Sequence, residues 1–264
     1  MKLIIGGGSY KGLAFIGSLH YLYKAGKIDK IDEFCGISIG SYIGVLIIIG
    51  FTPEEIFNEI IEIDFKEVID FDVDELLNKF TLNGNRVFKK FNEIFEKKES
   101  KDITIAQFEQ KYKTKINIVT TCINDRSTVI FDSDSPTVKV LDAVIASCSV
   151  PFIFPPYYIN GKYYVDGDVR NSHTQLNKKI DETTILIFLK DLECSEECFE
   201  NLSGYIGEII YTIMGKNSLD KDKSKYSIEL DLKYDMVADL KNITNETKTK
   251  LFCQGMKQAQ SCCV

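Results

Sequence analysis

The stretch FCGISIGSY, residues 34–42, decides the fold because it places one serine between two glycines at the end of an apolar run. Gly36, Ser38 and Gly40 have the G-x-S-x-G spacing of a nucleophile elbow, in which a strand ends in a sharp turn and a helix follows. The turn lifts the serine oxygen out of the sheet, and the glycines leave room where a β-carbon would clash. A five-residue pattern of this kind often arises by chance, so the surrounding sequence must show whether this segment is a nucleophile elbow.

The segments around the elbow predict strands that alternate with helices. Residues 2–5 are a short β-rich run, a glycine-rich loop follows them, and apolar residues then recur at helical spacing up to Gly26. The run after the elbow, residues 43–51, is apolar on all sides, as in a buried helix. The same patterns predict strands at 115–124, 127–132, 161–166 and 183–189, and helices at 53–63, 86–98, 104–112, 138–149 and 246–260.

This alternation predicts a three-layer α/β fold with a mostly parallel central sheet and helices on both faces. The sequence contains no internal repeat and no proline-rich linker, so no domain boundary stands out. We expect a catalytic domain over residues 1–190, with residues 191–264 forming a C-terminal helical extension packed on the same domain.

The composition is that of a soluble globular protein, with 44% hydrophobic and 27% charged residues among 264. A net charge of −7 argues against a nucleic-acid-binding protein, whose binding face is basic. The N-terminal apolar run is too short for a signal peptide, and residues 43–51 are too few to span a bilayer. These features predict a cytoplasmic protein without a transmembrane segment.

Eight scattered cysteines predict reduced thiols rather than a disulfide framework. Cys194 and Cys198 are four residues apart, but no second pair or histidine completes a zinc site, so we expect no metal. The C-terminal pair, Cys262 and Cys263, is open to acylation, although unmodified surface cysteines are the simpler interpretation.

A serine nucleophile needs a base, and the sequence has only two histidines to supply one. His20 lies inside a predicted helix, and His173 follows Asp166 by seven residues, which is poor geometry for a linear triad. Asp166 itself ends a strong β run, at the kind of sheet edge where active sites assemble. The alternative is that Asp166 and Gly167 form an ordinary turn, since this pair is frequent in turns.

An oxyanion site is the other requirement, and the loop Gly6-Gly7-Gly8-Ser9-Tyr10-Lys11-Gly12 lies between a predicted strand and helix. Its amides and the positive end of the helix dipole would stabilise a negative oxygen. Phosphate binding is the alternative interpretation. The loop fails the P-loop pattern because Leu13 follows Gly12, and the dinucleotide pattern because Lys11 stands where a third glycine is needed.

Four segments in order now resemble the patatin-like phospholipases over about residues 3–190: GGSYKG (7–12), GISIG (36–40), SCSVPFIFPP (147–156) and DGD (166–168). The resemblance implies a catalytic dyad with Ser38 as nucleophile and Asp166 as general base. It also implies an oxyanion hole from Gly7, Gly8 and the backbone near Ser9 and Tyr10. Residues that match the segment packed beside the active site are Ala146, Ser147, Pro151, Phe154, Pro155 and Pro156.

Three positions depart from the family pattern. Ser9 replaces a glycine of the loop, Asp168 stands where glycine or alanine is usual, and Thr174 stands where proline is usual, although Asn171 fits. A second carboxylate as close as Asp168 could raise the pKa of one member of the pair.

The resemblance implies hydrolysis of lipid acyl esters, as in a phospholipase A or lysophospholipase, without a cofactor, and the sequence contains no calcium-loop pattern. The alternatives are a catalytically weak or inactive lipid-binding member of the fold, and an acyltransferase. The expected partner is a lipid acyl ester, with peripheral membrane contact. The apolar stretch 152–159 fits either a lipid-facing wall or ordinary core.

Overall fold

A mixed eight-stranded sheet, in the order β5-β6-β3-β2-β1-β7-β8 with β4 also paired to β3, forms the centre of the molecule. The computed structural model describes residues 1–64, 86–170, 173–190, 208–209, 212, 219–232 and 243–263. The strands are β1 (Lys2–Ile5), β2 (Glu33–Ile37), β3 (Lys115–Cys122), β4 (Ser127–Phe131), β5 (Tyr157–Ile159), β6 (Lys162–Asp166), β7 (Thr184–Leu189) and β8 (Tyr226–Leu230).

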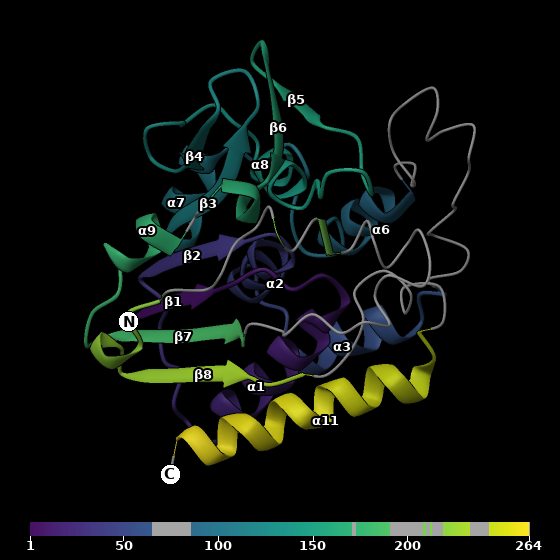
Figure 1. Cartoon of the computed structure of the whole chain (residues 1–264), viewed down its shortest axis with the longest axis vertical. Coiled ribbons are helices and arrows are strands. Elements are labelled where there is room, and N and C mark those ends of the chain that lie inside the picture. Colours follow the sequence, from purple (N-terminus) through teal and green to yellow (C-terminus); the bar gives the residue numbers. More distant parts are fainter. Residues whose placement is uncertain are drawn as a thin grey trace.

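The five strands β8, β7, β1, β2 and β3 run parallel, which confirms the expected mostly parallel sheet. The other end of the sheet is antiparallel, because β4 and β6 both pair with β3, and β5 and β6 form a hairpin (Figure 1). The sequence did not predict β5 or β8. Both are short, and polar or exposed side chains interrupt their apolar residues.

The helices are α1 (Gly12–Lys24), α2 (Ile39–Ile48), α3 (Pro53–Ile61), α6 (Arg86–Phe95), α7 (Ile105–Tyr112), α8 (Val140–Ser147), α9 (His173–Asn177) and α11 (Asn245–Cys262). Short 3-10 helices occur at η1 (Ser9–Lys11), η2 (Gly167–Arg170) and η4 (Lys221–Lys223). Every predicted helix that lies within the described residues is present. The polar stretch 191–225 lies mostly outside the described residues, as do Asn171, Cys194 and Cys198.

Apolar side chains pack on both faces of the sheet, because neighbouring residues of a strand point to opposite sides. In β1, Leu3 and Ile5 join a large core cluster with α1, α2, α8 and α11. Between them, Ile4 joins a smaller cluster with Leu176 of α9 on the other face. This arrangement confirms the three-layer α/β fold. Among the helices that the structure describes, none has the length and apolar composition needed to cross a membrane.

The C-terminal helix α11 lies directly against α1, the helix that follows the glycine-rich loop (Figure 1). A β-carbon on Gly17 would lie 1.9 Å from the carbonyl oxygen of Phe252, and one on Gly255 would lie 1.9 Å from that of Ala14. Ser18 adds a hydrogen bond, since its hydroxyl donates to the Gly255 carbonyl at 3.1 Å. The two backbones therefore touch at two glycines, one from each helix.

Candidate active site

Ser38 forms the turn between β2 and α2, as the elbow pattern predicts. Its φ of 50° and ψ of −134° are rarely adopted by residues other than glycine, so the surrounding structure must hold this backbone in place. A β-carbon on Gly36 would lie 2.5 Å from Ser41 Cα, and one on Gly40 would lie 2.3 Å from the Gly6 carbonyl oxygen. The two flanking glycines are therefore needed for close packing around the turn.

Hydrogen bonds fix the elbow from behind. The Ser38 amide donates to the Ser147 hydroxyl at 2.8 Å, and that hydroxyl donates to the Val119 carbonyl at 2.6 Å. The Ser38 carbonyl accepts from the Ser41 amide at 2.9 Å. Ser147 thus ties the serine turn to β3, which gives a physical role to the segment expected to pack beside the site.

The sheet register brings Asp166 next to the elbow. Ile37, the last residue of β2, pairs with Val119 of β3, and Asp166, the last residue of β6, pairs with the adjacent Thr120. The two strands therefore approach the same part of β3 from opposite directions. Ser38 and Asp166 meet where the strands end, although 128 positions separate them in the sequence.

The Asp166 carboxylate is fully buried, and its two oxygens differ in their surroundings. Oδ1 accepts a hydrogen bond from the Asp168 amide at 3.0 Å, whereas Oδ2 has no partner among the described residues. Burial raises the pKa of Asp166 well above its usual range, the nearby Asp168 charge raises it further, and the Ser38 hydroxyl opposes the rise by hydrogen bonding. Oδ2 is therefore a buried oxygen without a well-formed hydrogen bond among the described residues, on a carboxylate close enough to the Ser38 hydroxyl for that group to lower its pKa.

The glycine-rich loop contains two amides that make no hydrogen bond within the described part of the chain, and Gly7 carries the one shown to lie near Ser38. The Gly6 amide donates to the Ile187 carbonyl at 2.9 Å, so it belongs to the sheet. Within the described residues, no hydrogen bond engages the amides of Gly7 and Gly8. Ser9 has a φ of 50°, a left-handed backbone conformation that explains why glycine is usual at its position.

The rest of the loop packs tightly at the start of α1. Tyr10 and Lys11 are buried, Lys11 with only 1% of its surface exposed. A β-carbon on Gly12 would lie 2.8 Å from Ile39 Cγ1, so this glycine lets α1 approach the beginning of α2. These three positions hold the loop beside the elbow.

Neither histidine has a described contact with Ser38 or Asp166. His20 lies on α1, where its ring packs 5.4 Å from that of Phe252 and its Nδ1 lies 3.5 Å from Glu54. His173 begins α9, but its side chain lies outside the described residues, as does that of Thr174. Within the described part of the chain, no three His, Cys, Asp or Glu side chains are grouped as metal ligands.

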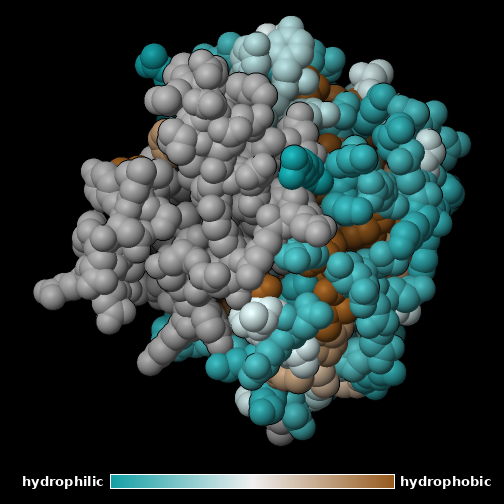
Figure 2. Space-filling model, turned by 90° about the vertical axis from the view of Figure 1, so that its right-hand side faces the viewer, coloured by the Kyte–Doolittle hydropathy of each residue, from teal (hydrophilic) through white to brown (hydrophobic). Residues whose placement is uncertain are grey.

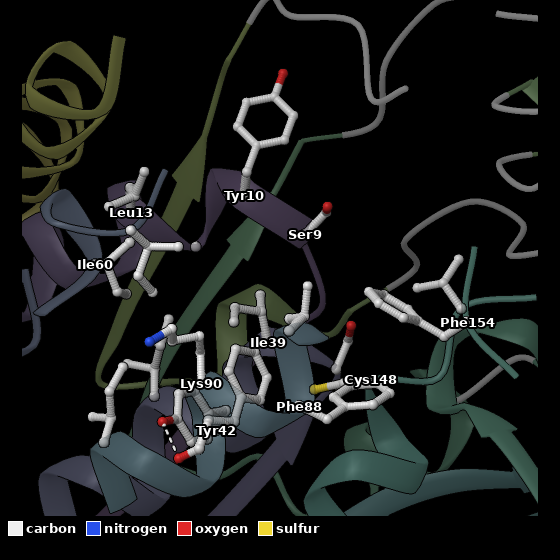
Figure 3. Close-up of a pocket in the computed structure, with 18 residues that line it drawn as sticks. Ser9, Tyr10, Leu13, Ile39, Tyr42, Ile60, Phe88, Lys90, Cys148 and Phe154 are labelled. Atoms are coloured by element: carbon white, nitrogen blue, oxygen red, sulfur yellow. Dashed lines mark hydrogen bonds between the residues drawn. The ribbon is translucent and has the colours of Figure 1, made fainter. Parts of the chain in front are cut away.

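An apolar pocket opens beside Ser38, between α1, α2, α3 and α6 (Figure 3). Its empty volume is about 890 Å³, part of which is open to solvent. Ser9 and Ser38 line it together with apolar side chains from each helix, among them Leu13, Ile39, Ile60 and Phe88. Figure 2 shows narrow hydrophobic strips between hydrophilic side chains on the side of the molecule that carries α3 and α6.

The sequence did not predict this pocket. Its walls come from separate helices, and the pattern of each helix by itself is that of an ordinary amphipathic helix. Tyr42 connects two of these walls: its hydroxyl donates to the Phe91 carbonyl at 2.8 Å, and the two rings stack 3.9 Å apart. Cys148 also lines the pocket, but burial raises the pKa of its thiol well above the usual range. A neutral thiol is a poor nucleophile, so Ser38 is the better candidate.

Comparison with known protein families identifies the family of this chain. The family model of the patatin-like phospholipases matches residues 3–174. The "Probable lipid hydrolase 463L" of Invertebrate iridescent virus 6 is 30% identical over 203 residues, which cover 70% of this chain and 68% of that protein. The "Uncharacterized protein R571" of Acanthamoeba polyphaga mimivirus is 28% identical over 278 residues, covering 98% and 92%.

Solved structures share the fold at low sequence identity. VipD from Legionella pneumophila has a TM-score of 0.56 at 12% identity, and the match covers 99% of this chain and 66% of VipD. The type III effector ExoU, from Pseudomonas aeruginosa, has a TM-score of 0.52 at 13% identity, covering 98% and 52%. This chain therefore spans about half to two thirds of the length of these two proteins.

Proposed function

Because this chain belongs to the patatin-like phospholipase family, we propose that it hydrolyses acyl esters of lipids with Ser38 as nucleophile and Asp166 as general base. One observation carries the proposal. A serine in a strained turn lies beside a buried carboxylate whose Oδ2 has no described partner, and the same serine lines an apolar pocket.

The proposed reaction has two halves. Asp166 accepts the proton of the Ser38 hydroxyl as Oγ attacks the ester carbonyl carbon, and the tetrahedral intermediate then collapses to an acyl-serine. The departing alcohol or lysolipid takes the proton from Asp166. In the second half, Asp166 accepts a proton from water, the resulting hydroxide attacks the acyl-serine, and the fatty acid leaves as the proton returns to Ser38. General-base assistance of this kind is typically worth about 10²–10⁴ in rate.

The free amides of Gly7 and Gly8 are the proposed oxyanion donors, because neither is engaged in a described hydrogen bond and Gly7 lies close to Ser38. One such donor is typically worth about 10²–10³ in kcat. Gly6 has a supporting role in this scheme, since its amide is bonded to the sheet.

The apolar pocket is the proposed site of the acyl chain. Its lining from α2, α3 and α6 has no negatively charged side chain, and Lys90 is its one cationic member among the described residues. Burial of each methylene is worth about 0.8 kcal/mol, so a pocket of this kind favours longer acyl chains over acetate. The family and this pocket together support a lipid ester as substrate.

A second candidate function is lipid binding with weak or absent turnover. The Asp168 carboxylate lies against Gly7, where its negative charge would oppose a developing oxyanion. This residue is also one of the three departures from the family pattern.

The test is release of p-nitrophenol from medium-chain acyl esters without calcium, measured for the wild type, Ser38→Ala and Asp166→Asn. Ser133→Ala and Asp134→Asn, on the exposed turn after β4, are matched controls. We expect turnover in the wild type and controls and none in either dyad variant. Turnover that survives Ser38→Ala would contradict the proposal. A folded wild type that binds lipid without turnover would favour the second candidate.

A further inference from the structure

Exposed hydrophobic side chains gather at one end of the molecule. Five large hydrophobic residues are exposed within the described chain, and Tyr23 is the one that lies elsewhere, at the end of α1. The other four belong to the turn after β3, the loop before β5 and the β5–β6 hairpin: Ile123 (47% exposed), Phe152 (43%), Tyr158 (59%) and Tyr163 (47%).

Three of these residues form one continuous surface. Tyr158 and Tyr163 face each other across the β5–β6 pair, and their ring centroids lie 5.1 Å apart. The Ile123 amide donates to the Tyr163 carbonyl at 2.9 Å, which fixes the turn after β3 beside the hairpin. We call Ile123, Tyr158 and Tyr163 the hairpin surface.

The hairpin surface lies beyond the same edge of the sheet as the active site. Tyr164 pairs with Cys122, the last residue of β3, so Tyr163 and the turn of the hairpin extend past the carboxyl end of that strand (Figure 1). Ser38 follows the carboxyl end of β2, which is parallel to β3. Strand β6 leads from the hairpin surface directly to Asp166.

Phe152 lies in the loop between α8 and β5, which also contributes Phe154 to the pocket. Its φ of 68° is unusual for a bulky residue and turns the chain sharply after Pro151. The ring of Phe152 is exposed, whereas Phe154, two residues later, lines the pocket beside Cys148. The segment therefore places one ring on the surface and another in the pocket.

The charges near the hairpin surface differ from those of the whole chain. Asp125 and Arg126 lie in the turn after β3, and Lys162 begins β6 and pairs with Asp125 at 2.5 Å. Among these three charged groups one positive charge, that of Arg126, is in excess, whereas the whole chain has a net charge of −7. An anionic membrane surface would therefore be repelled less by these turns than by the chain as a whole.

We propose that the hairpin surface rests in the interface of a phospholipid bilayer and turns the pocket towards its lipids. Tyrosine suits this position because its ring is apolar and its hydroxyl remains hydrated at the headgroup level. The orientation of the pocket towards lipids matters only if the proposed function holds, so this inference rests on that function. Membrane binding itself can be measured without turnover.

The experiment is co-sedimentation with vesicles of phosphatidylcholine containing phosphatidylserine, in a Ser38→Ala background so that no lipid is consumed. The test variant is Tyr158→Ser/Tyr163→Ser, Ile123→Ser is a second variant, and Tyr23→Ser is the matched control. We expect the double variant to partition about tenfold more weakly, because two exposed rings are lost, and the control to bind as the background does. With Ser38 restored, the double variant should hydrolyse a monomeric short-chain ester at the wild-type rate.

Equal sedimentation of all variants, or no sedimentation of the background protein, would overturn the proposal. Equal loss in Tyr23→Ser would also overturn it, because the effect would then not belong to this end of the molecule. If sedimentation velocity shows a dimer that the double variant abolishes while vesicle binding is unchanged, the surface binds a second copy instead. If the esterase assay fails while vesicle binding responds as expected, the chemistry is wrong and the membrane surface stands.

Discussion

The Asp168 carboxylate lies against Gly7 in the glycine-rich loop. A β-carbon on Gly7 would lie 1.9 Å from Asp168 Oδ2 and 3.3 Å from Ser38 Cβ. Asp168 and Ser38 therefore face the same side of Gly7, at the place where an ester would have to bind. Any side chain at position 7 would force the Asp168 carboxylate or the loop to move, and the family's smaller residue at position 168 would remove this constraint.

Replacement of Gly7 should reveal this contact. Gly7→Ala should lower kcat/KM about 10²-fold or more, because either the loop or Asp168 must move and one oxyanion donor is displaced. Gly7→Ala/Asp168→Gly should recover at least about tenfold over the single variant, since the clash is gone. The check is a double-mutant cycle on initial rates. Additive effects in that cycle would show that the two residues do not interact.

Removal of the Asp168 charge should move the pH profile. The proposed base, Asp166, can accept a proton only when it is ionised, and its pKa is raised by burial and then by Asp168, so activity should appear as pH rises through that pKa. Asp168→Asn keeps the size but removes the charge, which lowers the pKa of Asp166. The rising limb of kcat/KM against pH should therefore shift to lower pH in Asp168→Asn. An unshifted limb with a lower plateau would assign Asp168 a merely structural role.

Asp166→Asn should stabilise the fold while it abolishes turnover. The folded pKa of Asp166 lies above its unfolded value of about 3.9, so ionisation costs stability once pH exceeds that value. Asparagine does not ionise, so its advantage should grow as pH rises. The measurement is the melting temperature at pH 5 and at pH 8. In a chain of this size, each kcal/mol of unfolding free energy should change the melting temperature by about 2–4 °C. A variant that melts lower than the wild type at pH 8 would contradict this account.

The proposed acyl site predicts a change in chain-length preference. Ile60 lines the pocket from α3, and Ile60→Trp should fill part of it and lower kcat/KM for long acyl esters about tenfold, with short esters little affected. Asn58→Trp, on the exposed side of the same helix, is the matched control. Competition between butyrate and decanoate esters measures the ratio. A ratio that is unchanged in Ile60→Trp would place the acyl chain elsewhere.

The contact between α1 and α11 leads us to propose that the C-terminal residues fold with the catalytic domain as one unit. Gly255→Ala would place a β-carbon 1.9 Å from the Ala14 carbonyl oxygen and should cost about 1–3 kcal/mol of unfolding free energy. Cys253→Ala, at an exposed position of α11, should cost little. Urea unfolding followed by circular dichroism and by esterase activity should give one coincident transition. Activity that outlasts the helical signal would mean that α11 is dispensable.

Much of the fold could be predicted because the decisive signals are local. The elbow needs Gly36 and Gly40, and the start of α3 needs the Thr52–Glu55 capping box, in which each side chain accepts from the other residue's amide. These requirements act over a few residues, so they can be recognised from the amino-acid sequence. The strands β5 and β8 were missed because their pairing partners, and not their own side chains, stabilise them as strands.

The sequence by itself determined the strand–elbow–helix unit, the glycine-rich loop and the candidate pair Ser38 and Asp166. Only the tertiary structure decided how that pair meets. Ile37 at the end of β2 pairs with Val119 of β3, and Asp166 at the end of β6 pairs with the next residue of β3. It also decided that Asp168 lies against Gly7, that helices α1, α2, α3 and α6 border an apolar pocket, and that the exposed tyrosines of the β5–β6 hairpin lie beyond the carboxyl end of β3. Such relationships join residues distant in sequence, and chain packing alone sets their distances.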